Sequence, residues 1–85
     1  MENFRGTLLK DGQAITGGLD GKLTVDLDAN RTEHWSGFFT VPAGVDVQIS
    51  ERYELQLEDG RQGAIKVERV NQTGQGAFAS FVSGN

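Results

Sequence analysis

Apolar side chains recur at every second residue through most of the chain, and this period constrains the fold more than any other feature. In the segment KLTVDLD, Leu23, Val25 and Leu27 alternate with polar residues, and the same spacing recurs in the segment RYELQL. A period of two places alternate side chains on opposite faces of a strand, whereas an amphipathic helix repeats its apolar residues three and four positions apart. The pattern predicts an all-β fold.

Tight turns are predicted where Asp-Gly pairs interrupt the alternation. The pairs are Asp11-Gly12, Asp20-Gly21 and Asp59-Gly60. A two-residue type I′ turn requires a positive φ at both of its central residues, and Asp and Gly tolerate that conformation well. The clearest hairpin joins residues 51–58 to residues 62–70, with Asp59 and Gly60 as structural turn residues at positive φ.

Seven to eight short strands follow from the alternating segments and the turns between them. The predicted strands are 3–10, 13–17, 21–28, 34–41, 45–49, 51–58, 62–70 and 75–82. A chain of 85 residues encloses one hydrophobic core, so residues 1–85 are predicted to form a single domain. A small closed antiparallel barrel leaves no exposed strand edge, and we favour it over the alternative, a compact two-sheet sandwich.

The segment HWSGFFTV divides into two faces when it is extended. One face carries Trp35, Gly37 and Phe39, and its two large aromatic side chains are predicted to be structural residues of the core. The other face is polar apart from one phenylalanine, and it consists of His34, Ser36, Phe38 and Thr40. Aromatic side chains with polar neighbours are typical of protein interfaces. These four residues are therefore the candidate binding residues, with Phe38 at their centre.

Neither a metal site nor a cofactor site is predicted. Asp26, Asp28 and Asn30 have the spacing of the first ligands of an EF-hand loop, but the positions that require Gly and Glu hold Arg31 and Gly37. One histidine without any cysteine cannot supply the three or four nitrogen or sulfur ligands of an ordinary zinc site. The acidic segment is instead predicted to form a polar turn whose side chains bond local backbone amides.

His34 is the one candidate general base, because it is the only histidine. Glu33 precedes it directly, and neighbours on a strand point to opposite faces, so these two side chains do not form a pair. No serine or threonine can be placed beside His34 from the sequence, and no catalytic residue is assigned. We favour a surface role for His34 and keep a small enzyme that uses it as an alternative.

The charge balance argues against a nucleic-acid partner. The chain carries 8 Lys and Arg against 12 Asp and Glu, a net charge of −4, and nucleic-acid binding relies on clustered basic side chains. A nucleic-acid or nucleotide-binding barrel therefore ranks second to a protein-binding one. No apolar run is long enough to cross a bilayer, so no membrane partner is expected.

The amino-terminal segment MENFRGTLLKDG has no signal-peptide pattern, and the chain has no cysteine. Both features favour a reducing, cytoplasmic location, while a periplasmic location stays open. The function that the sequence favours is that of a non-catalytic protein-interaction module, which binds either a partner protein or a second copy of itself.

Trp35 provides a test of the predicted core. Because its indole shares the apolar face with Phe39, Trp35→Ala should lower the free energy of unfolding by roughly 3–5 kcal/mol. Chemical denaturation of the wild type and the variant measures this loss. The native emission of the single tryptophan should also be blue-shifted, and free quenching by iodide would place the ring at the surface instead.

Overall fold

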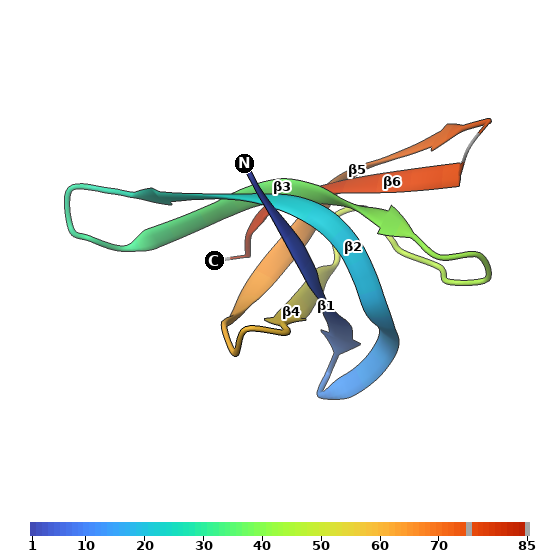
Figure 1. The fold of residues 1–85 in the computed structure, drawn as a ribbon, viewed down its shortest axis with the longest axis horizontal. Helices are drawn as coiled ribbons and strands as arrows, with labels where there is room; N and C mark the ends of the chain where they lie inside the picture. The colour runs from blue at the N-terminus through green and yellow to red at the C-terminus, as the bar shows by residue number, and fades with distance from the viewer. Residues whose placement is uncertain (75, 85) are drawn as a thin grey trace.

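A computed structural model of the chain describes residues 1–74 and 76–84, which form a closed barrel of six antiparallel strands (Figure 1). The strands are β1 (Glu2–Lys10), β2 (Gln13–Leu27), β3 (Glu33–Val41), β4 (Arg52–Leu57), β5 (Gln62–Thr73) and β6 (Gly76–Ser83). Their order around the barrel is β1-β2-β3-β6-β5-β4, and β4 pairs with β1 to close it. The predicted all-β antiparallel barrel is confirmed, with six strands in place of seven to eight.

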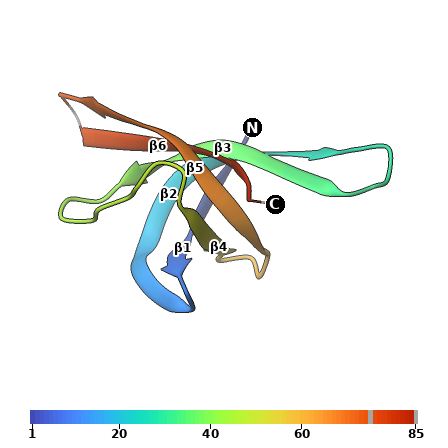
Figure 2. The same cartoon turned by 180° about the vertical axis from the view of Figure 1, so that it is seen from behind.

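Two hairpins extend beyond the barrel in opposite directions. Figure 1 and Figure 2 show the β2–β3 hairpin leaving on one side and the β5–β6 hairpin leaving on the other. The molecule accordingly measures 40 × 26 × 24 Å along its principal axes. Among the described residues there is no helix of the length and apolar character that crossing a membrane requires.

The predicted strands 13–17 and 21–28 are wrong as separate elements, because both belong to the continuous strand β2. The pairing of β2 with β1 shifts its register next to Gly17 and Gly18, where β2 carries one extra residue. Such a bulge bends a strand without ending it. The predicted strand 75–82 corresponds to β6, although residue 75 lies outside the described residues.

The Asp20-Gly21 pair lies inside β2, so the turn predicted there is wrong. Gly21 is needed for close packing between strands. A Cβ atom at this position would lie 2.7 Å from ring atoms of Phe4 and would collide with the carbonyl oxygen of Phe38. Asp20 points outward and forms an ion pair with Arg5, whose Nε lies 3.3 Å from the Asp20 Oδ1. Asp20 and Gly21 therefore form contacts between neighbouring strands and do not form a turn.

Residues 45–49 form part of a loop, so the strand predicted there is also wrong. Every strand of a closed barrel already has two neighbours, and an additional strand finds no free edge to pair with. The apolar residues of this segment contribute to the core instead of to a strand. Val47 is buried in the core and Val45 packs against it, whereas Ile49 is exposed.

The Asp11-Gly12 turn has the conformation that the sequence predicts. Lys10 pairs with Gln13, which leaves a two-residue loop, and φ is 52° at Asp11 and 80° at Gly12. Positive φ at both central residues is the requirement of the type I′ turn, whose twist matches that of the flanking strands.

The Asp59-Gly60 turn differs from the prediction, because only Gly60 has a positive φ, of 98°. The Leu57 N–H donates to the carbonyl oxygen of Arg61 at 2.7 Å, which encloses a three-residue loop. Loops of this length commonly place glycine in the left-handed region at the last position. Asp59 stabilises the loop through its side chain, which accepts hydrogen bonds from the backbone N–H and the Nε of Arg61 at 3.0 and 2.9 Å.

The interior of the barrel is filled by apolar side chains from all six strands. Phe81 packs against Phe39 with ring centroids 5.9 Å apart, and it meets Phe4 edge to face at 6.3 Å. The other buried side chains are Leu8, Leu19, Leu23, Trp35, Val47, Tyr53, Leu55, Leu57, Ile65, Val67 and Ala79. Removal of this apolar surface from water is the main driving force for folding.

Gly60→Val should lower the free energy of unfolding by more than about 1 kcal/mol, because a β-branched residue is strained at positive φ. Gly17→Val is the matched control, since Gly17 is also exposed and a Cβ atom there contacts only the Thr7 hydroxyl, at 3.6 Å. Thermal melting of both variants measures the difference. A Gly60→Val variant that melts with the wild type would contradict this account of the turn.

Candidate functional site

The four candidate binding residues lie in a line along the outer face of β3. They are His34, Ser36, Phe38 and Thr40, and the residues between them face the barrel interior. Alternate residues of a strand are about 7 Å apart, so the line is roughly 20 Å long. Phe38 and His34 are therefore separate features, each with its own surroundings.

Phe38 is accompanied by apolar side chains from the neighbouring strand β6. Phe78 meets Phe38 edge to face, with ring centroids 6.4 Å apart and ring planes at 76°. Val82 lies further along the outer face of β6, opposite Ser36. We call the partly exposed residues Phe38, Phe78 and Val82 the outer apolar surface, and the hydroxyl-bearing side chains around it are Ser36, Thr40 and Ser80.

Residues paired in register on β2, β3, β6 and β5 form a row across the outer apolar surface, with a basic side chain at each end. Lys22 on β2 is paired with Phe38, and Phe38 is paired with Ser80. Ser80 is in turn paired with Arg69 on β5, just after the β-bulge in that strand. Paired residues of adjacent strands point to the same face of the sheet, so both cations lie beside the apolar residues.

A third basic side chain, Lys66, is paired with Val82 in the next row. Within the described part of the chain, neither Lys66 nor Arg69 forms an ion pair with a carboxylate. Lys22 donates a hydrogen bond from its Nζ to the Asn3 Oδ1 at 2.7 Å, which leaves its charge uncompensated. The surroundings of the outer apolar surface are thus more basic than the net charge of the chain suggests.

A shallow depression of about 220 Å³ adjoins Phe38. Its lining residues are Asn3, Asp20, Gly21, Lys22, Phe38 and Thr40. Pockets for drug-sized ligands run from about 300 to 1,000 Å³. The depression therefore has the size for one side chain of a partner, next to the basic group of Lys22.

His34 lies where the β2–β3 hairpin leaves the barrel, and it contacts the hairpin loop. Its Nε2 lies 2.9 Å from the Asp28 Oδ2. The other carboxylate oxygen of Asp28 accepts the backbone N–H groups of Asn30 and Thr32 at 2.8 and 3.0 Å. The His34 hydrogen bond, with smaller contributions from these amides, lowers the pKa of Asp28 from its usual value. This arrangement fixes the conformation of the loop.

The segment considered as a calcium loop has the geometry of the predicted polar turn. Both carboxylate oxygens of Asp28 bond to groups of the protein itself, and Asp26 is paired with His34 across the hairpin. In residues 1–74 and 76–84, no three His, Cys, Asp or Glu side chains are grouped closely enough to hold a metal ion.

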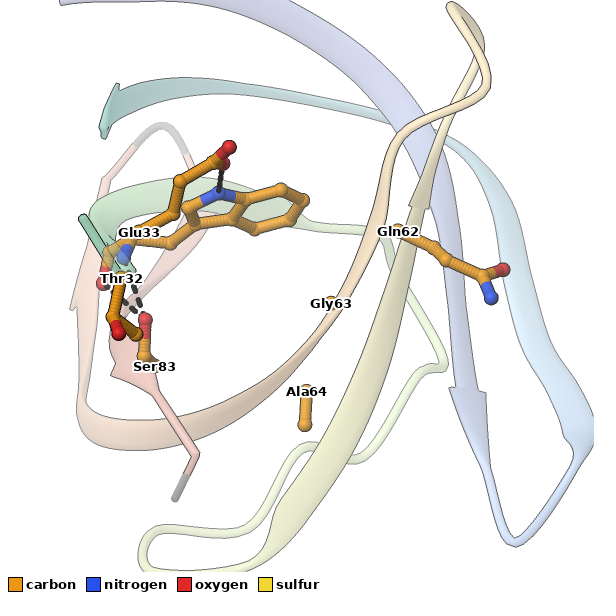
Figure 3. Close-up of a pocket in the computed structure, with 7 residues that line it drawn as sticks. Thr32, Glu33, Gln62, Gly63, Ala64 and Ser83 are labelled. Carbon is orange, nitrogen blue, oxygen red and sulfur yellow. Dashed lines mark hydrogen bonds between the residues drawn. The ribbon is translucent and has the colours of Figure 1, made fainter. Parts of the chain in front are cut away.

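A second hollow, the Trp35 cavity, lies at the end of β6. This strand separates β3 from β5, and its last register pairs are Val82 with Ser36 on one side and Ser83 with Ile65 on the other. The Gly84 N–H then donates a hydrogen bond to the Ala64 carbonyl oxygen at 2.9 Å. Beyond that point, among the described residues, β3 and β5 are separated by about 280 Å³ of space (Figure 3). The lining residues are Thr32, Glu33, Trp35, Gln62, Gly63, Ala64 and Ser83.

The indole of Trp35, on β3, reaches Gly63 of β5. A Cβ atom at Gly63 would lie 3.3 Å from the Cζ3 of this ring and 3.4 Å from its Cε3. Because residue 63 has no side chain, the six-membered part of the ring packs closely against the β5 backbone. Ser83 closes the β6 side, since its Oγ accepts the Trp35 N–H at 2.5 Å.

Glu33 is the one charged residue of the seven that line the Trp35 cavity. Its Oε1 accepts a hydrogen bond from the Trp35 Nε1 at 3.3 Å, and its other carboxylate oxygen remains available. No cationic side chain within the described residues forms an ion pair with Glu33. Figure 3 shows the Gln62 side chain directed away from Glu33 and Ser83.

The sequence did not identify the residues that surround Phe38 at the outer apolar surface or those that surround Trp35 at the cavity. The segment GAFASFVS carries a phenylalanine on each of its alternating faces, so its pattern does not tell whether Phe78 or Phe81 points outward. The cavity depends on where β6 ends relative to β3 and β5. Neither Gly63 nor Glu33 carries a sequence signal of that geometry.

The fold and the two sites define a small antiparallel β-barrel with an apolar surface on its wall and a cavity at the end of one strand. Comparison with protein-family models, with curated proteins and with solved structures gives no significant match to this chain.

The contact between His34 and Asp28 predicts a pH dependence of stability. Because the fold lowers the pKa of Asp28, its ionised form stabilises the native state above the unfolded pKa, and this contribution is lost as the pH falls through the folded pKa. Asp28→Asn should therefore melt below the wild type at neutral pH, and the two should converge at acidic pH, below the folded pKa of Asp28. Asp46→Asn in the exposed β3–β4 loop is the control, with no difference expected at either pH. A constant gap between Asp28→Asn and the wild type would contradict the assignment.

Proposed function

We propose that this protein is a non-catalytic interaction module that binds an acidic segment of a partner protein at the outer apolar surface. The observation that carries the proposal is the contact between Phe38 and Phe78, whose rings meet on the outside of the barrel with basic side chains on both sides. Aromatic anchors within a polar rim carry much of the binding energy of protein interfaces.

The charge distribution supports the choice of an acidic partner. Lys22, Lys66 and Arg69 flank the surface without carboxylate partners among the described residues, so carboxylates of a bound segment would complement them. Charge complementarity of this kind raises the association rate and selects the partner more than it raises affinity.

A protein partner is favoured over single-stranded nucleic acid for two reasons. Stacking platforms for bases combine aromatic rings with a continuous basic groove, and the three basic residues here stand apart on β2 and β5. The whole chain also carries a net charge of −4, which repels a polyanion. A small enzyme gains no support from His34, whose ring is hydrogen-bonded to the loop residue Asp28.

The experiment is selection from a random peptide display library against the wild-type protein. Selected peptides should combine an aromatic or aliphatic residue with flanking Asp or Glu. Truncation of an interface anchor typically costs about 2 kcal/mol or more, so Phe38→Ser and Phe78→Ser should each weaken binding of a selected peptide roughly 30-fold or more. Leu27→Ser is the control, because Leu27 is an exposed apolar residue that pairs with Glu33 at the end of β2, away from Phe38.

Several outcomes decide between the proposal and its alternatives. Equal binding of the selected peptides by Phe38→Ser and the wild type would contradict the proposal, provided that both proteins melt alike. Salt-sensitive binding of oligo(dT) that the same substitution abolishes, with no peptide selected, would establish nucleic acid as the partner. Concentration-dependent sedimentation of the wild type that Phe38→Ser removes would identify a second copy as the acidic partner.

A further inference from the structure

The β2–β3 hairpin carries an exposed apolar side chain where it projects from the barrel (Figure 1). Leu27, the last residue of β2, is 64% exposed. Val25 lies two residues earlier on the same face of the strand and is partly exposed. Contact with a second protein surface would remove this apolar area from water, which favours association.

Acidic side chains accompany Leu27 on the hairpin. Asp26 precedes it, Glu33 is paired with it across the hairpin, and both are exposed. Within the described part of the chain, neither carboxylate forms an ion pair with a basic side chain. Residues 25–33 contain three acidic residues against one basic residue, Arg31. The hairpin is therefore itself an acidic segment with an exposed aliphatic residue, which is the chemistry that the outer apolar surface complements.

The hairpin loop is held in one conformation by Asp28. Its side chain accepts the backbone N–H groups of Asn30 and Thr32 at 2.8 and 3.0 Å, and it contacts the Nε2 of His34 at 2.9 Å. A segment that is already ordered loses less conformational entropy on binding than a flexible one. The hairpin thus presents Leu27 and its acidic neighbours as a preformed ligand.

Leu27 cannot reach the outer apolar surface of its own chain. It lies on the face of β2 that carries the buried Leu23 further along the strand, whereas Phe38 lies on the outer face of β3. The register pairs Lys22 with Phe38, and Leu27 is five residues further along β2, a distance of roughly 17 Å. A contact between the hairpin and the outer apolar surface must therefore join two copies of the chain.

We infer that the β2–β3 hairpin of one copy binds the outer apolar surface of a second copy, with Leu27 packed against Phe38 and Phe78. The inference rests on the proposed function and names the acidic partner of that surface. Asp26 and Glu33 complement the three basic residues beside it, Lys22, Lys66 and Arg69.

The net charge of −4 does not prevent this contact, because charges further apart than about 8 Å are largely screened at physiological ionic strength. The hairpin and the wall of the barrel are different surfaces, so the contact is head to tail and joins copies into chains or a closed ring. A contact confined to one hairpin end is small, and small interfaces are typically weak and transient.

Sedimentation equilibrium of the wild type should show association that increases with protein concentration. Leu27→Ser and Phe38→Ser should each weaken this association roughly 10-fold or more, because each removes a large apolar side chain from the contact. Ile15→Ser is the matched control, since Ile15 is an exposed apolar residue at the opposite end of β2. Melting curves show whether each variant retains the fold.

Mixing the two variants tests the pairing of the surfaces directly. Leu27→Ser retains the outer apolar surface, and Phe38→Ser retains the hairpin. An equimolar mixture should therefore form dimers with one copy of each, while neither variant associates by itself at the same concentration. A fluorescent label on one variant allows its sedimentation to be followed in the mixture.

Charge substitutions at exposed positions test the same contact without altering the core. Asp26→Asn on the hairpin and Arg69→Gln beside the outer apolar surface should each weaken association several-fold, as expected for exposed charge pairs. Asp11→Asn is the control, because Asp11 lies in the β1–β2 turn at the other end of β2 and asparagine tolerates its positive φ.

A wild type that stays monomeric at every concentration would overturn the inference, and so would a mixture of the two variants that does not associate. Association that is lost in Leu27→Ser and kept in a folded Phe38→Ser would also overturn it, because the hairpin would then bind elsewhere. The proposed function is tested separately, since Leu27→Ser should still bind the selected acidic peptides like the wild type. Peptide binding that depends on Phe38, without self-association, would leave the proposed function standing and remove only the second copy as partner.

Discussion

Pairing between β1 and β4 closes the barrel, and the rest of the structure depends on that closure. The two strands meet over Gly6–Leu9 and Glu54–Leu57, segments that are far apart in the chain. The approach is close at Gly6, where a Cβ atom would collide with the backbone carbonyl oxygen of Gln56. Once this seam forms, each strand has a neighbour on both sides and directs alternate residues inward. The interior then fills with aromatic and aliphatic side chains around Phe81.

Closure also decides which side chains remain available for binding. In β3, Trp35 and Phe39 point inward, so Phe38 between them must point outward, where it meets Phe78 from β6. The length of β6 determines the second site, because its pairing ends at Ser83 while β3 and β5 continue past it. Trp35 is 7% exposed and belongs to the core, yet it borders the cavity that this ending leaves. One strand thus contributes to two sites on opposite faces of the barrel wall.

The polar contacts have a different role from the core, since they fix the conformation of loops. Asp28 organises the β2–β3 loop, and Asp59 organises the β4–β5 loop through Arg61. Arg61 also pairs with Glu2, so that this second loop is tied to the start of β1. Ion pairs as exposed as these contribute little to stability. Their effect is to hold the hairpin ends in one arrangement while apolar burial stabilises the barrel.

The sequence by itself determined the local structure, because a period of two and the conformational preferences of glycine act over a few neighbouring residues. It predicted the all-β class, the antiparallel barrel, the turn at Asp11 and the separation of Phe38 from Trp35 and Phe39. Only the tertiary structure decided that Gly21 is a point of close packing and that residues 45–49 pair with no strand, because both outcomes depend on which edges are already occupied. The partners of Phe38, and the cavity beside Trp35, likewise arise from residues distant in sequence whose register is set when the barrel closes.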